Sequence, residues 1–215
     1  MPEEVFDFHS HIYNVKNLPG KLTKKGIFKK FPVYGAKEEL KYNRLLFPGK
    51  KIHFLFAGFP YSGCNIESQN EFVWREAKEV EGAKFLIITA PWLKNRYLEE
   101  WVEKKGAAGF KPYKCFSKKD PENSRITDFL PYKQVEIASR YELVITLHLS
   151  KKGGLSDRHN FNDLLLLSDR YPSVRWNLAH CGRIFIPQYI EDISYGLKEF
   201  KGRNIYFDIS AVCDS

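Results

Sequence analysis

Short apolar runs alternate with longer amphipathic stretches along the chain, and this alternation constrains the fold more than any other feature. The runs are rich in β-branched and aromatic residues, as buried strands are. Seven of them occur, at 5–9, 52–58, 84–89, 107–112, 143–148, 174–180 and 204–209. Helix-like stretches lie between them, at 36–46, 65–80, 92–104, 126–141, 157–171 and 187–200, with Asn65 and Ser156 as N-cap candidates. Such a βα rhythm indicates a parallel sheet with covered faces.

A motif test separates the two α/β architectures that fit this rhythm. A Rossmann fold predicts a G-x-G-x-x-G after a strand, and the sequence has none. We therefore predict a TIM-like (β/α) barrel with seven strands visible in the 215 residues and the eighth missing, so that the seam between the first and seventh strands stays open. Residues 1–215 should form a single domain. Residues 12–50 exceed an ordinary βα connection, and we expect a long loop with one helix near 36–46. The loop is interpreted either as a partial lid over the site or as a surface excursion unconnected to it.

Composition narrows the class of protein without naming a partner. No run approaches the roughly 18 apolar residues of a membrane span, and the acidic N-terminus is unlike a signal peptide. Four widely spaced cysteines indicate reduced thiols and a cytoplasmic location. The net charge is +8, and lysine pairs in expected loops and helix ends supply much of the excess, so a solvated surface explains it.

Polar residues stand at the ends of four of the predicted strands. His9 and His11 end the first, Lys111 the fourth, His148 the fifth and His180 the sixth. In a barrel, functional side chains come from the carboxyl ends of several strands. His9 and His11 are two residues apart, so they should project to the same side of their strand.

Converging imidazoles would suit a divalent transition metal. Zinc is the first candidate, with manganese or another transition metal as alternatives, because nitrogen ligands suit such ions. A catalytic metal keeps a coordination position for water and lowers the pKa of that water. His53, at the start of its strand, and His159, on a helix, are interpreted as ordinary structural or surface residues.

The stretches "FDFHSHI", "GFKPY", "LHLS", "LAHCGR" and "YFDISA", in this order, resemble the amidohydrolase superfamily, specifically its amidohydrolase-2 branch. That branch includes metal-dependent hydrolases, lactonases and decarboxylases. The resemblance implies that His9, His11 and His148 bind a metal, and that His180 binds a second metal or polarises the substrate. The H-x-H pair and "AHCG" are its most specific parts.

Two departures from the family pattern concern carboxylate and lysine ligands. The family's metal-binding aspartate follows strand eight in a stretch resembling "GSDxP", which this sequence lacks. Asp208 lies in the strand-seven motif, where the family uses it structurally, and Asp214 would need an unusual turn to reach the metal. Lys111 has three interpretations: a substrate contact, a carbamylated bridge between two metals, or an ordinary charge at the barrel rim.

The combined hypothesis is a metal-dependent hydrolase of a small carbonyl or lactone-type substrate, with His180 as a catalytic residue. Lys111 and Arg183 are placed to bind an anionic, carboxylated substrate. The alternatives are a decarboxylase of the same branch, a TatD-type nuclease and a catalytically inactive relative. A small molecule is the expected partner; nucleic acid is not favoured, no membrane is expected, and a homo-oligomer is left open.

Overall fold

A computed structural model describes residues 2–24, 26–194 and 196–210. The chain divides into two compact units, which we describe separately. The first unit comprises Met1–Ile88 and Lys105–Ala108, and the second comprises Thr89–Lys104 and Gly109–Ser215. The prediction of a single domain with an open seam concerns the arrangement of these units and stays a prediction.

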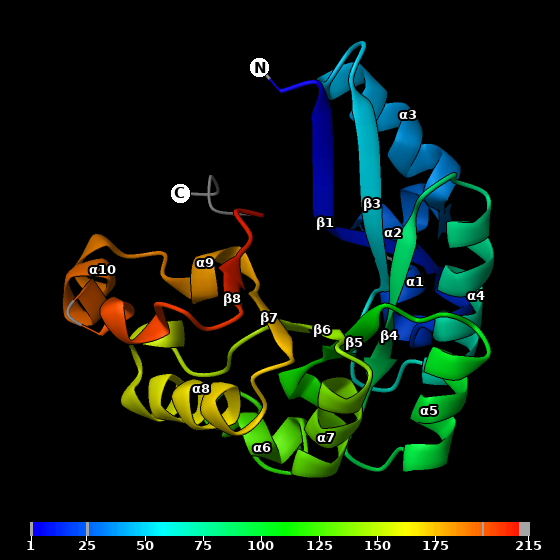
Figure 1. The fold of residues 1–215 in the computed structure, drawn as a ribbon. Helices are drawn as coiled ribbons and strands as arrows, with labels where there is room; N and C mark the ends of the chain where they lie inside the picture. Colours follow the sequence, from blue (N-terminus) through cyan, green and yellow to red (C-terminus); the bar gives the residue numbers. More distant parts are fainter. Residues whose placement is uncertain (1, 25, 195, 211–215) are drawn as a thin grey trace. The chain divides into compact units, whose positions relative to one another are not determined.

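The first unit is a small sheet with two helices packed on it (Figure 1). Its strand order is β2-β1-β3-β4, with β1 parallel to β3 and β3 parallel to β4. The strands are β1 (Glu4–Asn14), β2 (Val33–Tyr34), β3 (Lys51–Gly58) and β4 (Lys84–Thr89). The helical segments are η1 (Val15–Asn17), α1 (Gly20–Thr23), α2 (Gly26–Lys30), α3 (Ala36–Leu46) and α4 (Ile66–Lys78).

The second unit is a parallel sheet in the order β5-β6-β7-β8. Its strands are β5 (Gly109–Pro112), β6 (Val144–Leu147), β7 (Arg175–Leu178) and β8 (Ile205–Phe207). Its α-helical segments are α5 (Asn95–Glu103), α6 (Ile126–Phe129), α7 (Tyr132–Arg140), α8 (Arg158–Arg170), α9 (His180–Arg183) and α10 (Pro187–Ser194). Short 3-10 turns are η2 (Lys114–Phe116), η3 (Gly154–Ser156) and η4 (Leu197–Phe200).

All seven predicted strands are present, and three helix predictions need correction. Pro131, the N-cap of α7, separates α6 from α7, because its ring is incompatible with a continuous helix across 126–141. The segment 187–200 holds α10 and the separate 3-10 turn η4. Asn65 caps α4 as predicted, but Asp157 rather than Ser156 caps α8, since its carboxylate accepts from the amides of His159 and Asn160.

One strand was not predicted, and it lies inside the segment 12–50. The two-residue β2 runs antiparallel to β1, pairing Tyr34 with Tyr13 and Val33 with Asn14. The predicted helix at 36–46 is confirmed as α3. The rest of the segment folds into η1, α1 and α2 rather than an irregular loop. Its function as a lid stays a prediction.

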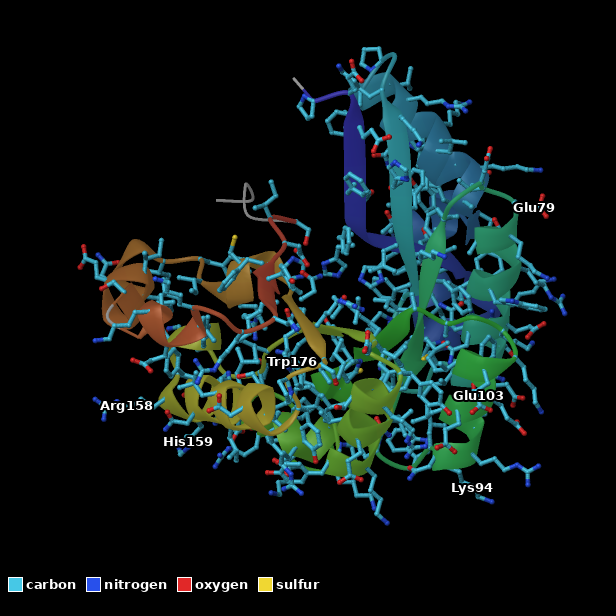
Figure 2. All side chains as sticks on the ribbon, in the orientation of Figure 1. Glu79, Lys94, Glu103, Arg158, His159 and Trp176 are labelled. Carbon is cyan, nitrogen blue, oxygen red and sulfur yellow. The ribbon has the colours of Figure 1, made fainter. Side chains whose placement is uncertain are left out.

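Each unit buries its own apolar side chains. In the first, Phe54 and Phe56 of β3 are stacked with ring centroids 4.9 Å apart, and both are buried. In the second, Trp176 of β7 is fully buried, whereas His159 lies exposed at the start of α8 (Figure 2). Among the described residues, no helix combines the length and apolar character needed to cross a bilayer.

Candidate metal and substrate site

His9 and His11 lie on the same side of β1, as their spacing predicts. Their Nε2 atoms are 3.1 Å apart, and both side chains are partly exposed. The β1–β3 register shifts by one residue between Asp7 and Ser10, so that His9 lies in a β-bulge. The backbone amide of His9 donates to the Asp7 carboxylate at 3.2 Å, which fixes the bulge locally.

The protonation of the His11 ring follows from its backbone partner. Its Nδ1 lies 2.9 Å from the carbonyl oxygen of Gly58, at the end of β3. A carbonyl only accepts, so His11 carries its proton on Nδ1 and directs the Nε2 lone pair toward His9. A histidine oriented by a backbone carbonyl is the usual arrangement of a metal ligand.

An aromatic cluster packs beside His11. The Phe59 ring, which follows β3, contacts His11 edge-on with centroids 5.8 Å apart. Phe28 of α2 packs against Phe59 at 5.2 Å and against Tyr13 at 5.0 Å. The segment between β1 and β2 is therefore anchored next to the histidine pair.

In the second unit, His180 opens a left-handed turn. Four consecutive residues, His180, Cys181, Gly182 and Arg183, have φ between 49° and 68°. Each non-glycine residue in this conformation costs roughly 1–2 kcal/mol, so three of them persist only because neighbouring interactions hold them. Such strain is concentrated at functional sites.

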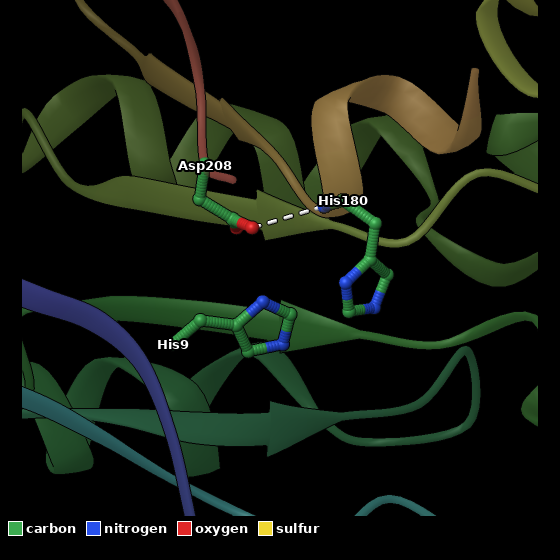
Figure 3. Close-up of side chains that lie close together, drawn as sticks. All are labelled: His9, His180 and Asp208. Atoms are coloured by element: carbon green, nitrogen blue, oxygen red, sulfur yellow. Dashed lines mark hydrogen bonds between the residues drawn. The ribbon is translucent and has the colours of Figure 1, made fainter. Parts of the chain in front are cut away.

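Asp208 and Ser210 hold this turn. The Asp208 carboxylate accepts from the His180 amide at 2.9 Å (Figure 3), and the Cys181 amide donates to the Asp208 carbonyl at 2.7 Å. Asn177 donates to the other carboxylate oxygen at 3.1 Å. These bonds agree with the structural role expected for Asp208.

The same residues orient the His180 ring. Its Nδ1 lies 2.8 Å from the Ser210 carbonyl oxygen and 2.9 Å from the Ser210 hydroxyl, which itself donates to Asp208. Both neighbours of Nδ1 are acceptors, so the proton of a neutral ring lies on Nδ1. Nε2 is then the unprotonated nitrogen of the neutral ring.

His148 directly follows β6 and packs between two rings. Its centroid is 5.2 Å from that of His180 and 4.6 Å from that of Tyr113. Burial, with Lys111, Arg183 and other nearby cations, lowers the pKa of His148 to about 2, so the ring is neutral. Its Nδ1 is buried and has no hydrogen-bond partner among the described residues. A buried, neutral, unpaired imidazole nitrogen is available as a metal ligand.

Lys111 lies on β5 with its side chain fully buried. Burial lowers the pKa of its ammonium to about 7, although the nearby Asp208 carboxylate opposes the shift. The interpretation of Lys111 as an exposed rim charge is therefore wrong. Buried lysines are rare and are typical of functional sites.

The guanidinium of Arg183 forms hydrogen bonds with the protein backbone. Its Nη1 donates to the carbonyl oxygens of Leu149 at 2.8 Å and Lys151 at 3.2 Å. These bonds fasten the left-handed turn to the loop after β6. Its predicted contact with a substrate stays a prediction.

The histidines fit a divalent transition metal. His11 and His180 each present Nε2, because their Nδ1 atoms are engaged by backbone carbonyls. The His9 and His11 nitrogens are separated by about the distance expected for two ligands of one ion, and His148 contributes an unpaired buried nitrogen. The convergence of His9 and His11 with His148 involves both units and stays a prediction.

The remaining sequence predictions have mixed outcomes. His53 stacks on Phe6 at 4.5 Å and lies 3.4 Å from Glu4, which confirms a structural role. Among the described residues, no disulfide joins Cys64, Cys115 or Cys181. Cys213 and Asp214 lie outside the described residues. Sequence analysis missed Ser210 and the Gly58 carbonyl, since only the fold reveals which atoms orient an imidazole.

Comparison with known proteins gives one family match. A family described as Amidohydrolase matches residues 66–215, which is 150 of the 215 residues. A search of curated proteins found no match.

Several solved structures are similar in fold. A probable 2-pyrone-4,6-dicarboxylic acid hydrolase from Acinetobacter baumannii, with citric acid bound, is 14% identical with a TM-score of 0.64; the match covers 96% of this chain and 70% of that one. The 4-oxalomesaconate hydratase from Rhodopseudomonas palustris is 15% identical with a TM-score of 0.59, covering 95% and 74%. A zinc-bound amidohydrolase from Burkholderia multivorans is 13% identical with a TM-score of 0.61, covering 96% and 69%. These similarities confirm the predicted fold class, a TIM-like (β/α) barrel.

Proposed function

Since this chain belongs to the amidohydrolase family, in the amidohydrolase-2 branch that its motifs resemble, we propose that it is a metal-dependent hydrolase of a small carbonyl or lactone-type substrate. His9, His11 and His148 would hold the ion, most simply zinc. When bound, such an ion supplies Lewis acidity and lowers the pKa of water toward neutrality.

The buried ammonium of Lys111 is the main observation that supports an anionic, carboxylated substrate. A fully buried cation is costly to desolvate, and a substrate carboxylate beside it would offset part of that cost. The pKa of about 7 would rise on pairing, so the substrate itself would charge the lysine fully. One structural relative is named for a dicarboxylic acid substrate, and its structure has citric acid bound. Both molecules carry carboxylates, which supports the proposal of an anionic substrate.

His180 is proposed to move the proton. In the neutral ring Nε2 is unprotonated, so it accepts a proton from the attacking water. The oxygen of that water bonds to the carbonyl carbon, the ring C–O bond of the lactone breaks, and Nε2 returns the proton to the leaving oxygen. Polarisation of a carbonyl, one of the two roles that the family resemblance implies for His180, would instead require the protonated ring.

Arg183 is proposed to position His180 through its backbone hydrogen bonds. Its bonds to the loop after β6 hold the turn that carries His180, whereas Lys111 binds the substrate anion. The Asp208 and Ser210 bonds fix the backbone amide and the ring Nδ1 of His180.

The test is a product analysis with the zinc- or manganese-loaded chain. Lactones, including 2-pyrone-4,6-dicarboxylic acid, and aromatic carboxylates are incubated with it, and products are identified by mass spectrometry. Hydrolysis predicts uptake of one water and no release of carbon dioxide. Carbon dioxide release would instead identify the decarboxylase alternative, and metal-dependent cleavage of DNA would identify the nuclease.

A charge variant tests the role of Lys111. Lys111→Met should lower kcat/KM for a carboxylated lactone about 100-fold and should change kcat/KM for its uncharged ester less than about 3-fold. Lys118→Met, at an exposed position of the same unit, is the matched control and should change neither. Equal losses on both substrates would contradict an anion-binding role.

A further inference from the structure

The net charge of +8 is concentrated in one segment. Residues 8–37 contain seven lysines and no arginine or acidic residue, whereas the remaining 185 residues hold 27 basic and 26 acidic side chains. The lysines are Lys16, Lys21, Lys24, Lys25, Lys29, Lys30 and Lys37. The expectation that lysine pairs spread along the chain supply the excess is therefore wrong: outside this segment the charges nearly balance.

Most of these lysines belong to a closed loop, residues 15–32, which we call the basic loop. Its ends meet where β1 pairs with β2, and the Val15 amide donates to the Pro32 carbonyl at 2.9 Å. The loop begins four residues after His11 on the same chain. It is also tied to the start of α4, since the Asn65 amide donates to the Asn17 carbonyl at 2.8 Å.

The apolar side of the basic loop faces the histidine pair. Phe28 is half-buried against Tyr13 and Phe59, and Phe59 contacts the His11 ring. The loop is therefore held beside His11 by aromatic packing rather than by its charges.

The charged side of the basic loop faces solvent. Its five described lysines are exposed, and none forms an ion pair within the described residues: Lys16, Lys21, Lys24, Lys29 and Lys30. Uncompensated cations beside a binding site raise the local concentration of anions and their association rate, by a factor of about 10 to 1,000.

We propose that the basic loop is an electrostatic entry that draws small polycarboxylate substrates to the His9–His11 pair. This inference rests on the proposed function, from which the anionic substrate comes. The loop attracts the anion from solution, and Lys111 is not needed for that step.

The local structure favours a small anion over a nucleic acid or a membrane. The helices of the loop are only four and five residues long, too short to lie in a DNA groove or along a bilayer surface. Its two aromatic residues are half-buried: Phe28 packs against Phe59, and Phe31 packs edge-on against Tyr34. Stacking on bases or insertion among lipids would need exposed rings.

A matched pair of charge reversals tests the proposal. Lys24→Glu/Lys29→Glu changes two exposed lysines of the basic loop; Arg44→Glu/Lys50→Glu changes Arg44 in the last turn of α3 and Lys50 directly before β3. Both variants lower the net charge by four. Ala57, which pairs with His11, lies about 20 Å along β3 from its first residue, so the Lys50 charge is remote from the pair.

Equilibrium dialysis measures binding of the 2-pyrone-4,6-dicarboxylate dianion and its uncharged dimethyl ester, at about 20 mM and about 500 mM NaCl. At low salt, Lys24→Glu/Lys29→Glu should weaken dianion binding about 5- to 10-fold, and Arg44→Glu/Lys50→Glu less than about 2-fold. High salt should remove the difference. Neither variant should alter ester binding.

The outcomes separate this inference from the proposed function. Suppose that no lactone or ester is hydrolysed, but that Lys24→Glu/Lys29→Glu alone loses dianion binding at low salt. The basic loop then attracts anions as proposed, and the hydrolase proposal fails. If hydrolysis is found and the two variants bind the dianion equally, the entry is wrong. A loss of binding to a short DNA duplex or to phosphatidylserine vesicles, with dianion binding unchanged, would also overturn it.

Discussion

The two histidine groups are positioned by different physical means. His9 and His11 are brought together by the alternation of one strand, with a bulge and one carbonyl completing their orientation. His180 is positioned by a left-handed turn that needs Asp208, Ser210 and the loop after β6. The first arrangement is local and costs little; the second stores strain and depends on residues distant in sequence.

The two histidine groups also differ in how exposed they are and in the charges around them. The His9–His11 pair is partly exposed and lies beside aromatic rings. The group around His180 contains the buried ammonium of Lys111 and the half-buried imidazole of His148, and the pKa values of both are strongly lowered. Substitutions in the group around His180 should therefore change the free energy of unfolding more than equivalent ones around His9 and His11.

The largest expected effect comes from the carboxylate that holds the turn. Asp208→Ala removes acceptors from the His180 amide, Asn177 and Ser210, and it leaves Lys111 without the charge that opposes its desolvation. The free energy of unfolding should fall by about 3–5 kcal/mol in a urea titration. Asp7→Ala removes the equivalent bond from the His9 amide and should cost less than about 1 kcal/mol. Equal losses of unfolding free energy in the two variants would contradict the claim that the His180 turn depends more on its carboxylate than the His9–His11 pair does.

The next effect concerns Lys111 and has a defined pH dependence. Its folded pKa, about 7, is below its unfolded value of 10.5. Between these pH values the unfolded state holds more protons, so this residue makes stability rise with pH. Below about pH 7 both states are protonated, and the full penalty is present.

Lys111→Met should therefore stabilise the protein in the absence of substrate. The free energy of unfolding should increase by roughly 2–4 kcal/mol at pH 6, and the gain should shrink as the pH rises toward 10. Urea titrations of both proteins across this range measure the difference. A constant difference at all pH values would show that packing, rather than the buried charge, is responsible.

A smaller effect tests the contact between η3 and the left-handed turn. Gly154 has φ +53°, and a Cβ there would collide with the Gly182 carbonyl oxygen and lie 2.8 Å from the Arg183 Cβ. Gly154→Ala should lower the free energy of unfolding by about 2–3 kcal/mol. Gly202→Ala is the control: its φ is also positive, at +81°, but its Cβ would meet no atom within 4 Å. It should cost only about 1 kcal/mol.

Sequence predicted the features that periodicity controls. The seven strands and the shared side of His9 and His11 follow from the alternation of apolar residues and from a two-residue repeat. The helix at 36–46 and the Asn65 cap were likewise local patterns.

Sequence could not predict the features that tertiary contacts control. The turn from His180 to Arg183 contains one glycine, so nothing local indicates four positive φ angles; Asp208 imposes them from 28 residues away. Arg183 follows His180 directly, but no local pattern indicates that its guanidinium donates to carbonyls of another loop. The basic loop was visible in the sequence as charge, but its place beside His11 depends on β2 and Phe28.

Zinc affinity tests the central claim most directly. If His9, His11 and His148 share an ion, the wild-type chain should bind zinc in a competition titration with a fluorescent chelator. His11→Ala and His148→Ala should then each weaken binding at least about 10- to 100-fold, although the two residues belong to different units. His159→Ala, on the exposed surface of α8, should have no effect. An absence of zinc binding, or wild-type affinity in both site variants, would contradict the account.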